Sequence, residues 1–306
     1  MNIRSLYFLM IAVFLVSCSA SSNKPIDQSS SKPRIVCTTN IVADALTQIC
    51  GDSAEVIALM SAGVDPHLYK ASQGDMEKLS NADYIFYNGL HLEGKMHEVL
   101  QQIGEQKSVL AVSEGLPKEQ LRLLGEGVYD PHVWFDASLW ALCAQTASDA
   151  LQKAYPSKAA YFKQNTTAYV ASLNALHNST KQRLSQIPTE KRVLVTAHDA
   201  FGYFSKAYGI EVKSLQGVST VTEPGLRDVT ELVNWLTERK IGYIFAETSV
   251  SDKGIKAVMD GCKQKGHALQ NGGTLFTDAL GADDSPSGNY IGMFEANVTQ
   301  IIASMR

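Results

Sequence analysis

The segment SKAAYFKQNTTAYVASLNALHNSTKQRLSQI, residues 157–187, decides how the rest of the chain is organised. Its apolar side chains recur at helical steps, and a proline stands directly before it and directly after it, at Pro156 and Pro188. This pattern is typical of one long helix. About thirty residues at about 1.5 Å per residue give a length of roughly 45 Å, more than a connection between adjoining lobes requires. We therefore expect a stiff strut that spans two lobes and limits hinge motion.

Short apolar runs alternate with helical patterns on both sides of this segment. Strands are expected at residues 34–38, 55–59, 83–87 and 108–112 before it, and at 192–196, 211–215, 242–247 and near 274–276 after it. Helices are expected at 41–49 and 75–81, and then at 227–239, 253–265 and 293–305. Such alternation implies parallel sheets covered by helices. The sequence thus predicts an α/β protein with two lobes, each with a parallel sheet covered by helices, joined by one long rigid helix.

The N-terminus has the pattern of an exported protein. Arg4 is the only charged residue before an unbroken apolar run over residues 6–16, which fits a signal peptide and is too short to span a membrane. The run ends in LVSC, residues 15–18, which resembles the lipobox of bacterial lipoproteins and predicts lipidation of Cys18. Residues 19–33 contain six serines and no apolar period, as expected of a flexible tether.

These features divide the chain into five parts. The parts are a signal peptide at 1–17, a lipidated flexible tether at 18–33, an N-terminal α/β lobe at 34–156, the linking helix at 157–187 and a C-terminal α/β lobe at 188–306. The expected location is the extracytoplasmic face of a membrane, at the cell surface or in the periplasm, where the lipid anchor holds the protein.

Composition excludes several classes of protein. The chain has 306 residues, 45% of them hydrophobic, and a formal charge of −4 from 27 basic and 31 acidic residues. No basic field exists to hold a phosphate backbone, so nucleic acid is not expected as a partner. Lipidation of Cys18 leaves four cysteines with three open pairings and no CxxC spacing, which excludes zinc-knuckle and thioredoxin sites. These are Cys37, Cys50, Cys143 and Cys262.

Three of the seven histidines stand in contexts that fix a side chain in place. His67 and His132 both follow an Asp-Pro pair, in which proline restricts the backbone and aspartate can bond the local chain. His198 directly follows the apolar run of residues 193–197, so it is expected at the carboxyl end of a buried strand, where open α/β sheets bind ligands. The three imidazoles predict a metal site.

A carboxylate is needed to balance a divalent cation, and Asp278 follows the apolar residues of the expected strand near 274–276. The ligand set His67, His132, His198 and Asp278 takes two residues from each lobe, so the ion is expected in the crevice between them. Such a set suits zinc, and manganese or iron could also occupy it. Glu247, at the end of another strand, is a candidate to accept the N–H of a ligand, with an ordinary ion pair as the alternative.

The other histidines have simpler interpretations. His177 is expected to be solvated on the long helix, and His267 lies in a loop. His91 and His97 flank Glu93 in a cluster that could bind metal weakly, but we interpret it as capping and solvating the start of a helix.

Four motifs, taken in order along the chain, resemble those of one family of known proteins. VDPHLY at 64–69, NGLHLE at 88–93, DPHVWFD at 130–136 and TAHDAFGYF at 196–204 resemble the TroA-like metal-binding lipoproteins, the ZnuA- and PsaA-related solute-binding subunits of zinc and manganese ABC importers. The resemblance covers about residues 34–305, and it implies two α/β lobes that hold a metal ion. A histidine at position 198 is of the TroA type, whereas residues 117–128 hold no histidine-rich loop of the kind found in many dedicated zinc members.

The resemblance implies a receptor that carries no enzymatic activity. It would deliver Zn²⁺, Mn²⁺ or Fe²⁺ to an ABC transporter permease with its cytoplasmic ATPase. Zn²⁺ is expected in the purified protein, Mn²⁺ or Fe²⁺ are alternative cargoes, and the chain is expected to be a monomer. Two other functions remain open at this point. A zinc hydrolase would use Glu247 or Asp199 as general base, although the chain has no HExxH motif, and an adhesin or structural lipoprotein would hold an incidental metal.

Overall fold

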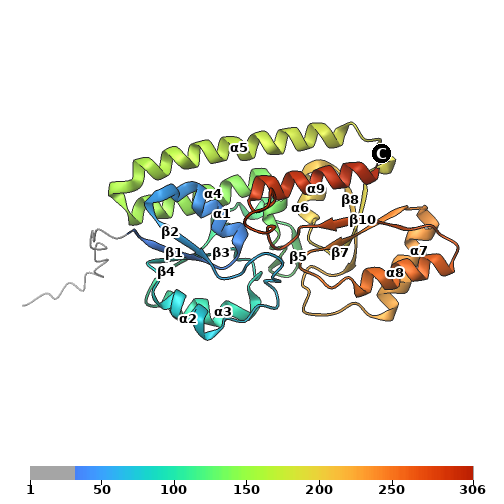
Figure 1. Cartoon of the computed structure of the whole chain (residues 1–306), viewed down its shortest axis with the longest axis horizontal. Helices are drawn as coiled ribbons and strands as arrows, with labels where there is room; N and C mark the ends of the chain where they lie inside the picture. The colour runs from blue at the N-terminus through green and yellow to red at the C-terminus, as the bar shows by residue number, and fades with distance from the viewer. Residues whose placement is uncertain (1–31, 306) are drawn as a thin grey trace, which may run out of the picture.

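The computed structural model describes residues 32–305 (Figure 1). Two lobes lie side by side beneath one long helix, α5 (Ala159–Ser185), which runs along the top of both. Its 27 residues make it about 40 Å long. It packs on α4 and α1 in the N-terminal lobe and on α6 and α9 in the C-terminal lobe. The prediction of two α/β lobes joined by a long helix is confirmed.

The N-terminal lobe is built on a four-stranded parallel sheet in the order β2-β1-β3-β4. The strands are β1 (Arg34–Cys37), β2 (Glu55–Ala58), β3 (Tyr84–Tyr87) and β4 (Ser108–Ala111). Ile35, Val36 and Cys37 of the central strand are fully buried, because helices cover both faces of the sheet. The helices are α1 (Asn40–Cys50), α2 (Gln73–Ser80), α3 (His97–Gly104) and α4 (Ala137–Ala154). A small antiparallel hairpin, β5 (Leu123–Gly125) and β6 (Val128–Tyr129), follows β4.

The C-terminal lobe contains two parallel strand pairs, β7 with β8 and β9 with β10, and β7 also lies against β9. The strands are β7 (Val193–His198), β8 (Glu211–Gln216), β9 (Tyr243–Glu247) and β10 (Gln270–Leu275). The helices are α6 (Gly202–Tyr208), α7 (Leu226–Arg239), α8 (Lys253–Gln264) and α9 (Tyr290–Met305). Figure 1 shows α7 and α8 on the side of the lobe away from α5, and α9 on the side next to it.

One hydrophobic core continues through both lobes under α5. Trp140 of α4, Leu173 of α5 and Phe294 of α9 are buried in the same cluster. Separating the lobes at this side would expose apolar surface, which costs about 25 cal/mol per Å². The shared core therefore gives a physical reason for the expected stiffness.

Helix α4 is the largest element that the sequence analysis did not predict. Leu139, Cys143, Ala147 and Leu151 recur every four residues and are all buried, so the helical signal was present in the sequence. Asp136 caps the start of α4 by accepting a hydrogen bond from the Ser138 N–H.

The described part of the chain also answers two questions about cysteines and membranes. Cys37, Cys50, Cys143 and Cys262 are all buried and free. Within residues 32–305, none of the helices is long and apolar enough to cross a membrane. The expected signal peptide and Cys18 lie outside the described residues.

Candidate metal centre

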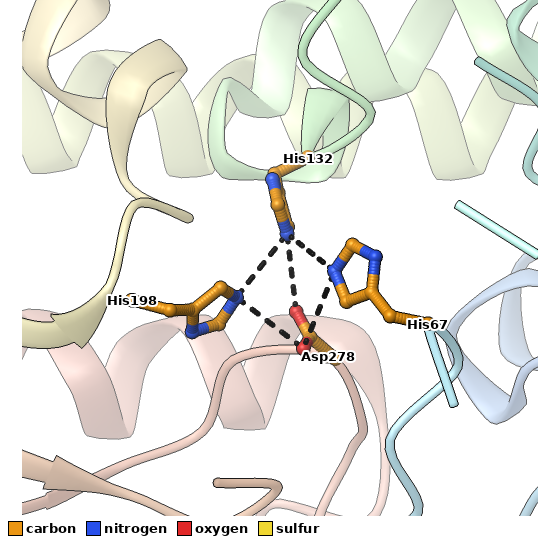
Figure 2. Close-up of side chains that lie close together, drawn as sticks. All are labelled: His67, His132, His198 and Asp278. Atoms are coloured by element: carbon orange, nitrogen blue, oxygen red, sulfur yellow. Dashed lines mark hydrogen bonds and ion pairs between the residues drawn. The ribbon is translucent and has the colours of Figure 1, made fainter. Parts of the chain in front are cut away.

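The structure brings together the four residues singled out in the sequence. His67 lies in the loop after β2, His132 follows the β5–β6 hairpin, His198 is the last residue of β7, and Asp278 lies just beyond β10. Ligand atoms from all four lie within 4.8 Å of one another. At most 3% of the surface of any of them is exposed. Figure 2 shows the three imidazoles and the carboxylate pointing toward a common centre from different parts of the chain.

Four of the separations between these atoms match those of a metal coordination sphere. His132 Nε2 lies 3.4 Å from His67 Nε2, 3.3 Å from His198 Nε2 and 3.4 Å from Asp278 Oδ1. His198 Nε2 lies 3.4 Å from Asp278 Oδ2, and the longest of these contacts, from His67 Nε2 to the same oxygen, is 4.0 Å. Atoms that bind a tetrahedral zinc ion at about 2.0–2.1 Å lie about 3.3–3.4 Å from one another. The arrangement fits one divalent ion with little movement.

His67 is held through its backbone by the aspartate of its own Asp-Pro-His turn. Asp65 Oδ1 accepts a hydrogen bond of 2.8 Å from the His67 N–H. The other oxygen of Asp65 accepts one of 2.6 Å from the hydroxyl of Thr220, which belongs to the C-terminal lobe. The loop that carries His67 is therefore tied to the opposite lobe.

His132 has a carboxylate partner on the ring nitrogen that faces away from the centre. Asp130 Oδ1 lies 2.7 Å from His132 Nδ1 and accepts a second hydrogen bond from the His132 backbone N–H. In the neutral form of the ring the proton is held on Nδ1, so the lone pair of Nε2 faces the other three side chains.

Arg122 is a residue of this site that the sequence analysis missed. Its guanidinium donates to Asp130 Oδ2 at 2.8 Å and binds both oxygens of Asp199, at 3.1 and 2.7 Å. Asp199 directly follows His198, so one arginine ties the partner of His132 to the chain segment of His198. A lone arginine before a short hairpin carries no sequence signal for this role, because its two partners come from different lobes.

The structure places Glu247 against His198. Glu247 Oε2 forms a short contact with His198 Nδ1, and Oε1 accepts hydrogen bonds from the backbone N–H groups of Ala197 and His198. The Glu247 side chain is fully buried. The carboxylate fixes both the ring and the end of the strand that carries it.

Asp278 lies in a segment fixed by hydrogen bonds to its neighbours. The indole N–H of Trp134 donates to the carbonyl of Thr277 at 3.0 Å, and Ser249 Oγ lies 3.4 Å from Asp278 Oδ2. Asp278 Oδ1 is buried, lies 3.4 Å from His132 Nε2 and accepts no well-formed hydrogen bond from the described residues. A buried carboxylate oxygen without a donor is costly, and a cation would satisfy it.

Burial and charge act in opposite directions on the pKa values of the site. Burial lowers the pKa of His67 to about 4, so this imidazole is neutral at pH 7. Burial also disfavours the charged forms of His132 and His198, but Asp130 and Glu247 outweigh it and raise both pKa values. Burial would raise the pKa of Asp278, but His198 and His132 hold it well below its usual range.

The raised pKa values of His132 and His198 predict that metal and protons compete. Without metal these imidazoles keep their protons to a higher pH than free histidine, and a metal ion must displace them. Metal affinity should therefore increase as pH rises. As pH falls, the affinity should decrease by up to about tenfold per pH unit for each proton displaced. Calorimetry in buffers of different ionisation enthalpy counts these protons. Binding without proton release, at an affinity that does not change between pH 5.5 and 8, would contradict the prediction.

The remaining histidines lie elsewhere. His177 is half-buried, lying 3.2 Å from Asp136 and 3.3 Å from the Tyr208 hydroxyl, so the prediction that it is solvated is wrong. His177 lies on the side of α5 that faces the start of α4 and the end of α6, so Asp136 and Tyr208 contact it. His267 lies in a loop and contacts the carbonyl of Ile241. His91 and His97 are exposed as expected, but helix α3 begins without a side-chain cap, so the capping interpretation is wrong.

Known proteins resemble this chain over almost its whole length. It is 46% identical over 301 residues to the manganese-binding lipoprotein MntA of Bacillus subtilis (strain 168), which covers 97% of each chain. It is 45% identical over 274 residues to the zinc-binding protein TroA of Treponema pallidum (strain Nichols), covering 90% of this chain and 89% of that one. The manganese ABC transporter substrate-binding lipoprotein scaA of Streptococcus gordonii is 32% identical over 306 residues, 97% of each chain.

A solved structure and a family description agree with these relatives. The structure of the periplasmic zinc-binding protein TroA from Treponema pallidum superposes with a TM-score of 0.88 at 45% identity, over 90% of this chain and 99% of that one. The resemblance to TroA-like lipoproteins that four sequence motifs indicated is confirmed. The family model described as ZnuA, zinc-uptake complex component A, periplasmic, matches residues 35–304. With nearly every described residue inside that match, the chain belongs to the ZnuA family.

Proposed function

We propose that this protein is the extracytoplasmic receptor of an ABC-type importer and binds a divalent transition-metal ion through His67, His132, His198 and Asp278. The buried cluster of three imidazoles and one carboxylate, shared between two lobes, carries the proposal. The names of the relatives support it, because they are zinc- or manganese-binding lipoproteins and substrate-binding components of ABC transporters. The partners would be a permease with its cytoplasmic ATPase, and the receptor would act as a monomer.

Zinc is the ion that we expect in the purified protein. Three imidazole nitrogens and a carboxylate form a tetrahedral set that suits Zn²⁺, and zinc stands above manganese and iron in affinity for nitrogen donors. Mn²⁺ or Fe²⁺ remain alternatives for the transported ion, because a cell selects metals by availability as well as by affinity. Elemental analysis of protein purified from its native host distinguishes these cargoes.

The surroundings of the site favour a receptor over a zinc hydrolase. A catalytic zinc keeps an open position for water and a free general base nearby. Here four protein side chains converge on the centre. Both carboxylates that could serve as the base are engaged, Asp199 with Arg122 and Glu247 with His198.

Metal import in living cells tests the proposal and separates it from an adhesin or structural lipoprotein. Cells that lack the protein should accumulate less metal from a depleted medium, and the wild-type gene should restore uptake. A gene carrying His198→Ala should not restore it, because the buried ligand is lost. Normal uptake of zinc, manganese and iron in the deletion strain would contradict an importer function.

We also propose a lipid anchor at Cys18, outside the described residues. The sequence LVSC at 15–18, followed by a serine-rich tether, supports it. Cys18→Ala should release the protein from membranes or leave it unprocessed, because no thiol remains to be acylated. Since one acyl chain holds a protein only weakly, the mass of the mature protein should show more than one. Unchanged membrane fractionation and mature mass in the variant would refute lipidation at this residue.

A further inference from the structure

A second pair of imidazoles lies outside the candidate metal centre, in the segment that runs from the end of β3 to the first residue of α3. His91 and His97 are both exposed, and their ring centroids lie 5.7 Å apart. In the candidate metal centre the three pairs of imidazoles lie 5.2, 5.4 and 6.0 Å apart. The ring separation of the exposed pair therefore falls within the range of these three pairs.

The backbone at Leu90 and His91 has a conformation that residues other than glycine rarely adopt. Leu90 has φ 53° and His91 has φ 65°, both in the left-handed region. Such residues cost free energy and persist only where their surroundings impose them. The conformation therefore fixes the direction of the Cα–Cβ bond of His91.

Buried contacts on both sides of His91 impose this conformation. Glu93 accepts hydrogen bonds from the backbone N–H groups of Asn88 and Gly89, at 2.7 and 3.2 Å, and from the hydroxyl of Thr38 at 2.7 Å. Met96, which directly precedes His97, is fully buried. The two imidazoles thus project from a segment that is anchored at its start and at its end.

A cavity of about 280 Å³ lies beside the pair and offers room for water. Tyr87, Tyr129, Glu93 and both histidines are among the residues that line it. The Glu93 carboxylate already accepts hydrogen bonds from the protein, so two imidazole nitrogens remain as the protein ligands for an ion. Water would complete the coordination. Such a site binds Zn²⁺, Ni²⁺ or Cu²⁺ in preference to Mn²⁺ or Mg²⁺.

We propose that His91 and His97 form a second, solvent-accessible binding site for a zinc-type divalent ion. This site is weaker than the buried one, because two imidazoles take the place of four protein ligands. It is independent of the proposed transport function, since none of the four residues of the buried cluster contributes to it.

Calorimetric titration of the processed protein with Zn²⁺ tests the proposal. After the first equivalent fills the buried site, a second should bind about a hundredfold or more weakly, at one ion per chain. Titration with Mn²⁺ should show no second equivalent in the same concentration range. His91→Asn and His97→Gln should each weaken the second event about tenfold or more and leave the first unchanged. Asparagine is chosen at position 91 because it tolerates the left-handed backbone.

His267→Ala is the matched control, because it removes an imidazole from a loop elsewhere and should change neither event. An unchanged melting temperature of the variants excludes unfolding as the cause of a loss. Three outcomes would overturn the proposal. These are the absence of a second zinc equivalent in the wild type, its persistence when both histidines are replaced, and half an ion per chain, which would place the metal between two copies.

Discussion

Replacing His198 by alanine is expected to weaken zinc binding by about a hundredfold to a thousandfold. Zn²⁺ binds to sites of four protein ligands with a free energy of about 10–16 kcal/mol. If this free energy is divided equally, each ligand contributes about 2.5–4 kcal/mol. The loss should lie toward the upper end, because His198 is fully buried and alanine leaves Glu247 without the ring that it contacts. Competition with a chromophoric chelator measures affinities in this range.

His132→Ala should have a similar effect, since this ring is also fully buried and lies within 3.4 Å of three other ligand atoms. The matched control is His177→Ala, which removes a half-buried imidazole that already has a carboxylate partner in Asp136. Binding should be unchanged in that control. If His177→Ala cost as much affinity as His132→Ala, the proposed ligand set would be wrong.

The carboxylates behind the ligands should have the next largest effect. We expect Asp130→Asn and Glu247→Gln each to reduce metal affinity about 10- to 100-fold, although neither residue belongs to the proposed ligand set. The reason is that each carboxylate lies against the Nδ1 of a ligand ring, which keeps its proton there and leaves Nε2 free. The amide variants retain the shape of the side chain and lose its charge.

A second measurement separates this positioning role from a general loss of stability. Since Asp130 and Glu247 raise the pKa values of His132 and His198, each variant should lower the pKa of its imidazole. The decline in metal affinity with falling pH should then begin at a lower pH than in the wild type. Glu55→Gln is the control, because Glu55 forms a half-exposed ion pair with Arg34, and such pairs contribute little. Wild-type affinity and an unchanged pH profile in Asp130→Asn and Glu247→Gln would refute the role.

Much of the fold could be predicted because its signals are local. The strands at β1 to β4 and the helix α5 follow from apolar spacing and from the prolines around residues 157–187, which are properties of short stretches of chain. The start of β10 shows where local signals fail. This strand begins at Gln270 and includes two glycines, so its extent depends on pairing with β9 and not on its own apolar content.

The sequence by itself determined the fold class and the four side chains that converge. Asp-Pro-His turns and strand ends orient residues within a few positions of themselves, so His67, His132, His198 and Asp278 could be chosen without knowing their distances. Only the tertiary structure decided what stands behind and beside them. Arg122 reaches Asp199 across 77 positions, and Thr220 reaches Asp65 across 155. The physical reason is that hydrogen bonds between distant segments depend on how the two lobes pack, which no short stretch of sequence encodes.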